Sequence, residues 1–265
     1  MKKLFLFTLL AIAAISFNAC SKDETWPDDS PIIEFKDSYF LEALVSTDND
    51  DGSKIDKNGD GKISEKEASV VRLLTLSDFN IRCVDEISYF TALISLGCNN
   101  TQLTSLDVSR NTELKELVCR DNTQLTSLDV SKNTKLECLY CDNTQLTSLD
   151  MSRNTELEEL FCRDNTQLTS LDVSKNTKLT HLDCDNNQLT SLDVSKNTEL
   201  GWLYCNNNQL TSLDLSKNTE LNKLNCSGNN LKSVIFQRNI DYRLLPSLEA
   251  IWDEYGDIIT YVYVD

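Results

Sequence analysis

Residues 179–231 read LTHLDCDNNQLTSLDVSKNTELGWLYCNNNQLTSLDLSKNTELNKLNCSGNNL and contain three near-copies of one segment. Each copy has the form L-x-x-L-x-C, with an asparagine three residues after the cysteine. Self-similarity at a fixed period of about 20 residues indicates a solenoid, in which each unit buries its apolar face only against its neighbours. Extending the register along the chain places seven cysteines at one repeat position, every 21 or 22 residues: Cys98, Cys119, Cys141, Cys162, Cys184, Cys205 and Cys226.

This pattern resembles the leucine-rich repeat, with cysteine where that family usually has its third leucine, and its 21/22-residue units are similar to those of internalins. The resemblance covers residues 71–236. It implies parallel strands along the concave side of a curved sheet, and an asparagine ladder in which Asn187, Asn208 and Asn229 bond the backbone of neighbouring turns. The second leucine and the cysteine are two residues apart, so both point to one face of a strand. We therefore expect a β-rich leucine-rich-repeat solenoid with a small helical N-terminal cap.

The second half of each unit, L-T-S-L-D-V-S-K/R-N-T, hardly changes from Leu103 to Leu221. Leu106 and Val108 form a second inward pair, which predicts an extended segment or short strand on the convex side. Two outward columns of opposite charge follow, either as an ion- or ligand-binding stripe or, as we expect, as a solvated face whose charges offset each other. The acidic column is Asp107, Asp129, Asp150, Asp172, Asp193 and Asp214, and the basic one is Arg110, Lys132, Arg153, Lys175, Lys196 and Lys217.

The cysteines allow three interpretations. Ten cysteines in an exported chain can form a disulfide framework. A zinc array would need histidine or paired cysteines at short spacing, and His181 is the only histidine. We expect reduced core thiols instead, because the seven share one inward position and free cysteine packs as a small hydrophobe. Cys83 and Cys138 lie off this ladder; Cys138 is expected to face outward, where it would be reactive in electropositive surroundings.

The N-terminus has the pattern of an export signal. Lys2 and Lys3 precede an apolar run that ends before Cys20, and the run is short for a transmembrane helix. A small residue, cysteine and a polar tether resemble a bacterial lipoprotein signal, which implies cleavage after residues 1–19 and lipidation of Cys20. The Ser-Lys-Asp-Glu that follows is similar to the surface-export signal of Bacteroidetes-type lipoproteins. We therefore predict an exported outer-membrane lipoprotein at the cell surface; the alternative is an ordinary secretory signal.

Residues 56–67, DKNGDGKISEKE, match the calcium loop of EF-hands and dockerins at every diagnostic position. Calcium prefers six to eight hard oxygen ligands, and Gly61 permits the sharp turn. The alternative is an acidic turn that only starts a helix, because Ser64 and Glu67 also form a capping box. The predicted cofactor is Ca²⁺, with ligands from Asp56, Asn58, Asp60, Lys62 (carbonyl), Ser64 and Glu67.

The remaining regions divide around the repeats. We expect an acidic tether over 20–34, a helical cap over 35–70 with helices at Tyr39–Val45 and Lys66–Leu73, and a C-terminal cap over 237–265 with a strand at Ile258–Val264. Terminal rungs need such caps because their apolar edge would otherwise face water.

Composition excludes several functions. The net charge of −17 disfavours nucleic acid and anionic lipid as partners. The sequence has no serine elbow and no phosphate-binding glycine loop, and its acids stand in repetitive columns, so we do not expect an enzyme.

Variation between repeats is concentrated at the outward positions of the L-x-x-L-x-C strand, whereas the convex half hardly changes. Clustered aromatic side chains on a sheet are typical of contact surfaces, although cross-strand packing is the alternative. Three functions fit this face: a surface-anchored protein-interaction or adhesion module, a carbohydrate-binding lipoprotein that uses Trp202 and Tyr204, or a structural surface component. We expect a monomer with a protein or glycan partner, bound by Arg120, Tyr140, Phe161, Arg163, His181, Trp202 and Tyr204.

Overall fold

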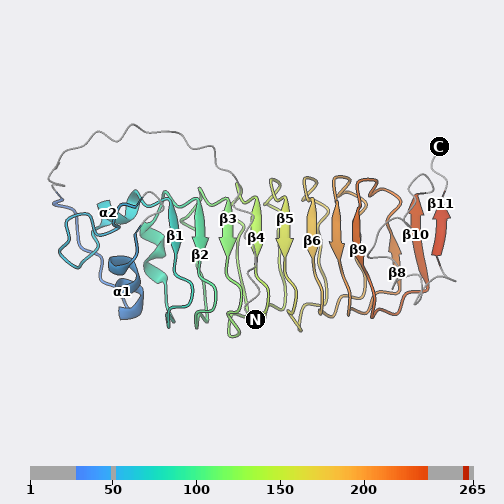
Figure 1. Cartoon of the computed structure of the whole chain (residues 1–265), viewed down its shortest axis with the longest axis horizontal. Helices are drawn as coiled ribbons and strands as arrows, with labels where there is room; N and C mark the ends of the chain where they lie inside the picture. The colour runs from blue at the N-terminus through green and yellow to red at the C-terminus, as the bar shows by residue number, and fades with distance from the viewer. Residues whose placement is uncertain (1–27, 49–51, 238–258, 263–265) are drawn as a thin grey trace.

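The structure, a computed structural model, describes residues 28–48, 52–237 and 259–262 of the 265-residue chain. The described part begins with two short helices and continues as a solenoid of parallel strands, one per repeat (Figure 1). The elements are α1 (Ser38–Ser46), α2 (Glu65–Ser69), β1 (Leu73–Thr75), the 3₁₀ helix η1 (Asp85–Tyr89), β2 (Ser95–Gly97), β3 (Glu116–Val118), β4 (Cys138–Tyr140), β5 (Glu159–Phe161), β6 (His181–Asp183), β7 (Trp202–Tyr204), β8 (Ser212–Asp214), β9 (Lys223–Asn225), β10 (Ser233–Gln237) and β11 (Ile259–Val262).

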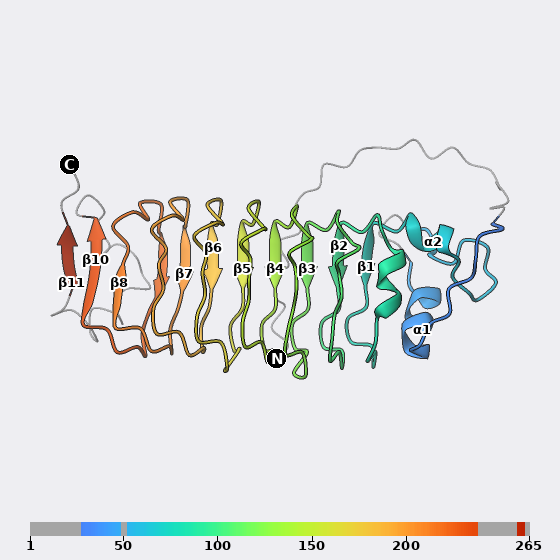
Figure 2. The same ribbon diagram turned by 180° about the vertical axis from the view of Figure 1, so that it is seen from behind.

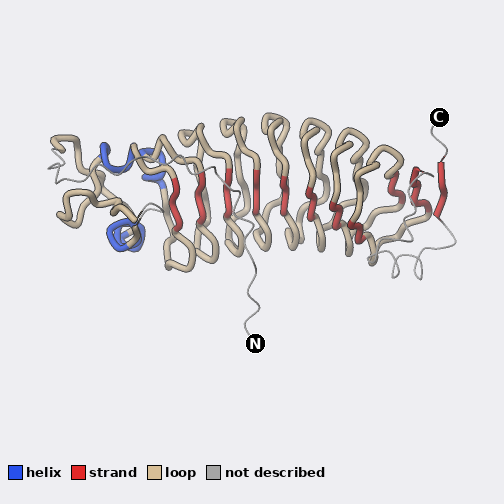
Figure 3. The backbone as a smooth tube through the Cα atoms, turned by 45° about the horizontal axis from the view of Figure 1, so that its top comes forward, coloured by secondary structure: helices blue, strands red, loops and turns tan. Residues whose placement is uncertain are grey.

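The concave side is one parallel sheet of eight strands in the order β1-β2-β3-β4-β5-β6-β7-β9. Figure 3 shows its strands in one continuous row along the solenoid. The central leucine of each strand is in register with the next, as Leu160 is with Leu182 and Leu182 with Leu203. These leucines and the ladder cysteines are all buried, which confirms the predicted solenoid and its inward Leu–Cys pair. Burial of this repeated apolar column is the main favourable term holding the rungs together.

The convex side is extended, as expected. Val108 is fully buried and Leu106 is 7 % exposed, so the second inward pair forms. Strand geometry is sparse there: Asp107 and Asp129 form an isolated parallel bridge, and β8 joins β10 and β11 in a three-stranded parallel sheet at the C-terminal end (Figure 2).

Two ladders of buried asparagines satisfy the backbone of the turns. In the first, which the resemblance implied, Asn208 Nδ2 donates to the carbonyls of Cys184 and Cys205 at 2.9 and 3.1 Å. The second ladder was not expected. Asn154 Nδ2 donates to the carbonyls of Val130 and Asn133 at 3.0 and 2.8 Å, and the equivalent asparagines do the same in five other rungs. Since an unpaired buried carbonyl is costly, these side chains fix the stacking of successive turns.

The N-terminal cap covers the first rung. Asp37 caps α1 by accepting from the Tyr39 amide at 2.9 Å, and its other oxygen accepts from the Arg82 amide at 2.6 Å. Phe40 is fully buried, with its ring 6.2 Å from that of Phe90. Helix α2 is shorter than the expected Lys66–Leu73, because Leu73 already pairs with Ser95 as part of β1.

At the other end, β11 lies within the expected strand Ile258–Val264 and pairs with β10. The rest of the predicted C-terminal cap lies outside the described residues.

Candidate functional site

The first and third residues of each concave strand lie on the outer side of the sheet, because the central leucine points inward. This places the predicted contact residues on one face, in adjacent rungs. Arg163 is exposed, whereas the other six are half-buried: Arg120, Tyr140, Phe161, His181, Trp202 and Tyr204. We call this surface, from β3 to β9, the concave face.

Three of these side chains, Arg120, Tyr140 and Phe161, pack together on the concave face. The rings of Tyr140 and Phe161 lie 5.0 Å apart at 25°, and the Arg120 guanidinium carbon lies 4.4 Å from the Tyr140 centroid. Arg120 Nε also lies 2.6 Å from Asp142 Oδ2, although the two atoms are too poorly aligned for a hydrogen bond. The same guanidinium carbon lies 5.5 Å from the Phe161 centroid, so the guanidinium packs against both rings, as the cross-strand alternative proposed.

Cys138 lies at the first position of β4, in register with Glu116 and Glu159. It was expected to face outward as a candidate reactive thiol, but it is only 3 % exposed. Burial, and then the nearby carboxylates of Glu159 and Glu116, raise the pKa of its thiol to about 12. The expectation of an exposed thiol was wrong because the long side chains on both sides cover this short one.

Trp202 is enclosed by its own neighbours. Lys223 Nζ lies 3.3 Å from the indole centroid, and the His181 ring meets the indole edge-on at 4.3 Å. Burial lowers the pKa of His181, Glu159 opposes this shift, and Lys223 adds to it. His181 is therefore a neutral packing partner at pH 7.

Three aspartates on the concave face were not selected from the sequence. Asp142 and Asp183 are 3 % and 5 % exposed, and Asp185 is half-buried. Burial raises the pKa of Asp142 to about 6 against the opposing effect of Arg120 and Arg163.

Asp183 and Asp185 lie close together above the sheet. Burial and then the charge of Asp183 raise the pKa of Asp185 to about 7, while the Asn206 amide and the Arg163 charge lower it and Asp164 raises it. Burial also raises the pKa of Asp183, whereas the Asp185 amide and the charges of Arg163 and Arg120 lower it. The repeat register places both at outward positions on either side of an inward cysteine, but nothing in the sequence signals that Asp183 is buried.

The predicted calcium loop is closed by hydrogen bonds. Asp56, 6 % exposed, accepts from the amides of Gly59 and Gly61 at 2.7 and 2.9 Å. Glu67, 1 % exposed, accepts from the amide of Lys57 at 2.7 Å and forms the capping box with Ser64. Ser64 Oγ also donates to Asp28.

The loop residues fit calcium by type and only in part by position. Asp56 and Glu67 are buried carboxylates with no ion pair to lysine or arginine among the described residues. Asp60 is exposed. It accepts a hydrogen bond from the backbone amide of Lys62 at 2.9 Å and one from the side-chain amide of Asn58 at 3.2 Å. Within the described ranges, no three histidine, cysteine, aspartate or glutamate side chains gather closely enough to hold a metal ion. Asp60 would have to turn inward to complete a site.

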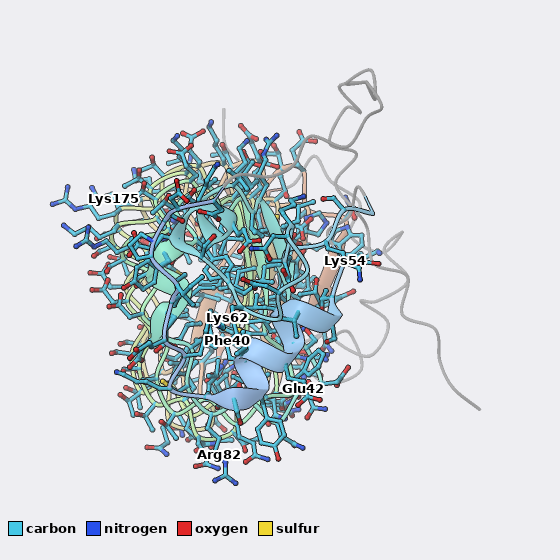
Figure 4. All side chains as sticks on the ribbon, turned by 90° about the vertical axis from the view of Figure 1, so that its left-hand side faces the viewer. Phe40, Glu42, Lys54, Lys62, Arg82 and Lys175 are labelled. Atoms are coloured by element: carbon cyan, nitrogen blue, oxygen red, sulfur yellow. The ribbon has the colours of Figure 1, made fainter. Side chains whose placement is uncertain are left out.

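The other predicted features are placed as follows. Each convex aspartate accepts from the amide of the serine two residues later, as Asp172 does from Ser174 at 2.9 Å, so the acidic column shapes the turns. Lys175 projects away from the solenoid (Figure 4).

Cys20 lies outside the described residues, and in the part that is described no helix is long and apolar enough to cross a membrane.

Comparison with known proteins supports the repeat assignment. The family described as Leucine Rich repeats (2 copies) matches residues 155–197. No curated protein matches the sequence significantly. The fold is similar to the functional domain of InlJ from Listeria monocytogenes, which includes a cysteine ladder: identity is 31 %, the match covers 80 % of this chain and 54 % of that one, and the TM-score is 0.59. The chain thus spans about half of that structure.

Two further solved structures share the fold. Internalin C2 from Listeria monocytogenes is 19 % identical, with 86 % of this chain and 94 % of that one covered and a TM-score of 0.65. The ectodomain of the Arabidopsis thaliana receptor kinase GASSHO1/SCHENGEN3, solved in complex with Casparian Strip Integrity Factor 2, is 22 % identical, with 65 % and 26 % covered and a TM-score of 0.53. At these identities the likeness concerns the fold alone.

Proposed function

We propose that this leucine-rich-repeat protein is exported and binds a protein partner on its concave face. The observation that carries the proposal is the distribution of variation along the solenoid. The convex half repeats the same residues from rung to rung, whereas the concave face carries different aromatic, acidic and basic side chains in each. Packing alone would be satisfied by repetition, so this variation indicates recognition of an irregular surface such as that of a protein.

The side-chain geometry favours a protein over a glycan. A sugar stacks on an open ring face, but Tyr140 and Phe161 stack on each other with the Arg120 guanidinium against both, and Lys223 lies over the Trp202 ring. Rings held in this way present less open surface while still supplying rigid contact area. The plant receptor kinase of this fold was solved in complex with Casparian Strip Integrity Factor 2, and solenoids generally use their curved surface for binding. The fold is typical of binding scaffolds, and we propose no enzymatic activity.

A binding screen tests this proposal. The chain without residues 1–19 would be displayed against a library of extracellular proteins, alongside the concave variant Tyr204→Ala and the convex variant Lys175→Ala. A specific partner should lose about 1–4 kcal/mol of affinity with Tyr204→Ala and about 0.5 kcal/mol or less with Lys175→Ala. Partners that prefer the convex face, or the absence of any specific partner, would favour the structural-component alternative.

The cellular placement is a separate proposal: a surface-exposed outer-membrane lipoprotein anchored through Cys20. The motif around this cysteine and the internalin-like repeat support it. Cys20→Ser should convert a membrane-associated protein into a soluble exported one, because the variant cannot carry the acyl chains that would anchor it to the membrane. Protease treatment of intact cells tests exposure, and full protection of the repeats would place them on the periplasmic side.

The loop 56–67 is proposed to bind one calcium ion, held by Asp56, Asn58, Asp60, Lys62, Ser64 and Glu67. Bound calcium would neutralise the buried carboxylates of Asp56 and Glu67 and tie the loop to α2. We expect a dissociation constant of about 0.1–1 mM, the range of extracellular modules. At ten times that concentration calcium should add about 1.4 kcal/mol of stability.

The matched variants are Asp60→Ala with Glu67→Gln, which should abolish the calcium-dependent gain, and Glu65→Gln on the exposed side of α2, which should keep it. An equal gain in wild type and the double variant would show that the loop is only a cap. The gain on adding calcium is the readout, because Glu67→Gln also weakens the capping box.

A further inference from the structure

Glu159 lies next to two side chains that can both bind its carboxylate. In the outer row formed by the first residue of each concave strand, the register from β4 to β7 reads Cys138, Glu159, His181 and Trp202. The Tyr140 hydroxyl donates to Glu159 Oε2. The other oxygen, Oε1, lies 3.9 Å from His181 Nδ1, which is within ion-pair range but too long for a hydrogen bond. The carboxylate therefore has one bonded donor and one titratable neighbour.

The neutral His181 ring has another partner for its N–H group. Nδ1 lies 2.9 Å from Thr180 Oγ1, and the Thr180 hydroxyl donates to the Glu158 carbonyl at 3.0 Å. A hydroxyl has a single proton, so Thr180 accepts from the imidazole, and we assign the ring proton to Nδ1 on this basis. At neutral pH the imidazole is therefore satisfied by Thr180, and Glu159 bonds Tyr140.

Two charged side chains act on the titration of His181. Burial lowers its pKa first, the charge of Glu159 raises it, and the charge of Lys223 lowers it. The neighbour on β7 is the uncharged indole of Trp202. The folded ring therefore takes up its proton below the ordinary histidine value of 6.5. Burial and then the bond to Glu159 raise the pKa of Tyr140, so its hydroxyl remains protonated throughout this range.

A proton on His181 changes which contact of Glu159 is the stronger. The two side chains are only 26 % and 21 % exposed, so solvent screens the attraction between imidazolium and carboxylate less than in a surface pair. Such a charge-assisted bond has a length of about 2.7–2.9 Å, which requires Oε1 to move about 1 Å towards β6. The Tyr140 ring is held back from following, because it stacks on Phe161 at 5.0 Å and packs against Arg120.

We propose that Glu159 and His181 form a proton-operated switch in the concave face. When His181 takes up a proton, the Glu159 carboxylate moves from the Tyr140 hydroxyl to the imidazolium, and the hydroxyl becomes available to water or to a partner. The contacts offered between β4 and β6 then differ between acid and neutral pH, so a partner bound there changes its affinity with pH. This regulation rests on the proposed function, whereas the switch itself belongs to the free chain.

His181 is the only histidine in the sequence, so its imidazole gives a single NMR signal. The chain without residues 1–19 would be titrated from pH 8 to about pH 4.5 with labelled histidine and tyrosine, and the Tyr140 signal assigned through Tyr140→Phe. We expect the Tyr140 ring signal to shift with the same midpoint as His181. Melting curves check that the chain stays folded over this range. A His181 signal that does not titrate in the folded chain would overturn the inference.

Three variants separate the switch from other effects of pH. His181→Gln should abolish the shift of Tyr140. Glu159→Gln should abolish it and lower the pKa of His181, because the attracting charge is gone. The matched control Glu158→Gln, at an exposed position one residue away, should keep the shift. A Tyr140 shift that persists in His181→Gln would report another group, such as Asp142 with its pKa of about 6, and would overturn the inference.

The exchange between the two partners is tested by Tyr140→Phe. Deleting the hydroxyl removes the competitor for Glu159, so the pKa of His181 should rise above its wild-type value. The control Tyr204→Phe, which removes a hydroxyl elsewhere on the concave face, should leave it unchanged. An unchanged pKa of His181 in Tyr140→Phe would mean that the carboxylate serves both groups at once, and this would also overturn the inference.

A partner from the binding screen separates this inference from the proposed function. The ratio of its affinities at pH 7.5 and pH 5 should differ about fivefold or more between wild type and His181→Gln. A partner that is weakened by Tyr204→Ala but has the same ratio in both chains would leave the proposed function standing and overturn the regulation. A Tyr140 shift governed by His181, with every partner engaging the convex face, would support the switch and overturn the proposed function.

Discussion

The guanidinium of Arg120 lies over the ring of Tyr140 in the next rung, 4.4 Å from its centroid. It also contacts the buried carboxylate of Asp142, which belongs to the same rung as Tyr140. The concave face thus neutralises one of its buried aspartates internally. Asp183 and Asp185, two rungs further along, have no such partner among the described residues. The charge of Arg163 lowers the pKa of both without a direct ion pair.

Removing Arg120 should destabilise the folded chain, because the buried charge of Asp142 then loses its nearby cation. We expect Arg120→Ala to reduce the free energy of unfolding by about 1–3 kcal/mol at pH 8. The loss should be smaller at pH 5, because Asp142, with a pKa of about 6, is then largely protonated in the folded state. Urea denaturation at both pH values measures this, with the convex variant Arg110→Ala as control. A loss that is independent of pH would mean that Arg120 acts through packing alone.

Neutralising Asp185 should stabilise the chain. Its folded-state pKa of about 7 lies above the ordinary value, so the folded state binds the proton more tightly than the unfolded chain and stability falls as pH rises from about 4 to 7. Asp185→Asn should therefore match wild type near pH 4 and exceed it by about 1 kcal/mol at pH 8, a rise of about 2–4 °C in melting temperature. A destabilised Asp185→Asn at pH 8 would show that the charge is already compensated.

The second asparagine ladder should be essential to the packing of successive solenoid turns on one another. Asn154→Ala leaves the carbonyls of Val130 and Asn133 without their donor, and should cost about 2–4 kcal/mol in two buried hydrogen bonds. The exposed convex variant Lys175→Ala should change stability by about 0.5 kcal/mol or less. Thermal unfolding of the two variants compares them. A near-neutral Asn154→Ala would mean that water replaces the amide.

The rate of thiol labelling should depend on how deeply each cysteine is buried and not on its position in the repeat. The nine described cysteines form no disulfide with one another, and burial raises the pKa of Cys138 to about 12. We expect Cys138 and the ladder cysteines to react at least about a hundredfold more slowly than free cysteine in the folded chain, and fully on unfolding. Half-buried Cys83 should react first. Rapid labelling of Cys138 would contradict its burial, and mass spectra showing ladder disulfides would contradict the packed-thiol core.

The sequence predicted the backbone better than the electrostatics. Identical residues at a fixed spacing, such as Cys162 and Cys184, must occupy equivalent positions, so strand placement and the inward leucines could be read directly. The asparagine ladder of Asn208 was predicted by resemblance. The ladder of Asn154 was missed although its asparagine hardly changes between repeats, because a polar residue in an exposed-looking turn gives no sign of its own burial.

The repeat register placed the candidate side chains on the outer side of the concave sheet, as the structure does, but the candidates were selected by residue type. Tyr140, Phe161 and Trp202 were predicted as open aromatic contacts, whereas each ring packs against a neighbouring side chain. Asp183 is buried, and its neighbours in register are Phe161 and Tyr204, 22 residues before and 21 after it. Periodicity shows which residues are neighbours, but the depth of a side chain follows from the packed volumes around it.

Hydrogen–deuterium exchange of the chain with and without its protein partner tests the central claim most directly. Binding on the concave face predicts added protection in β4 to β7 and the residues just after each cysteine, with unchanged exchange in the convex turns around Asp172 and Lys175. Added protection confined to the convex turns, with the concave strands unchanged, would contradict the account.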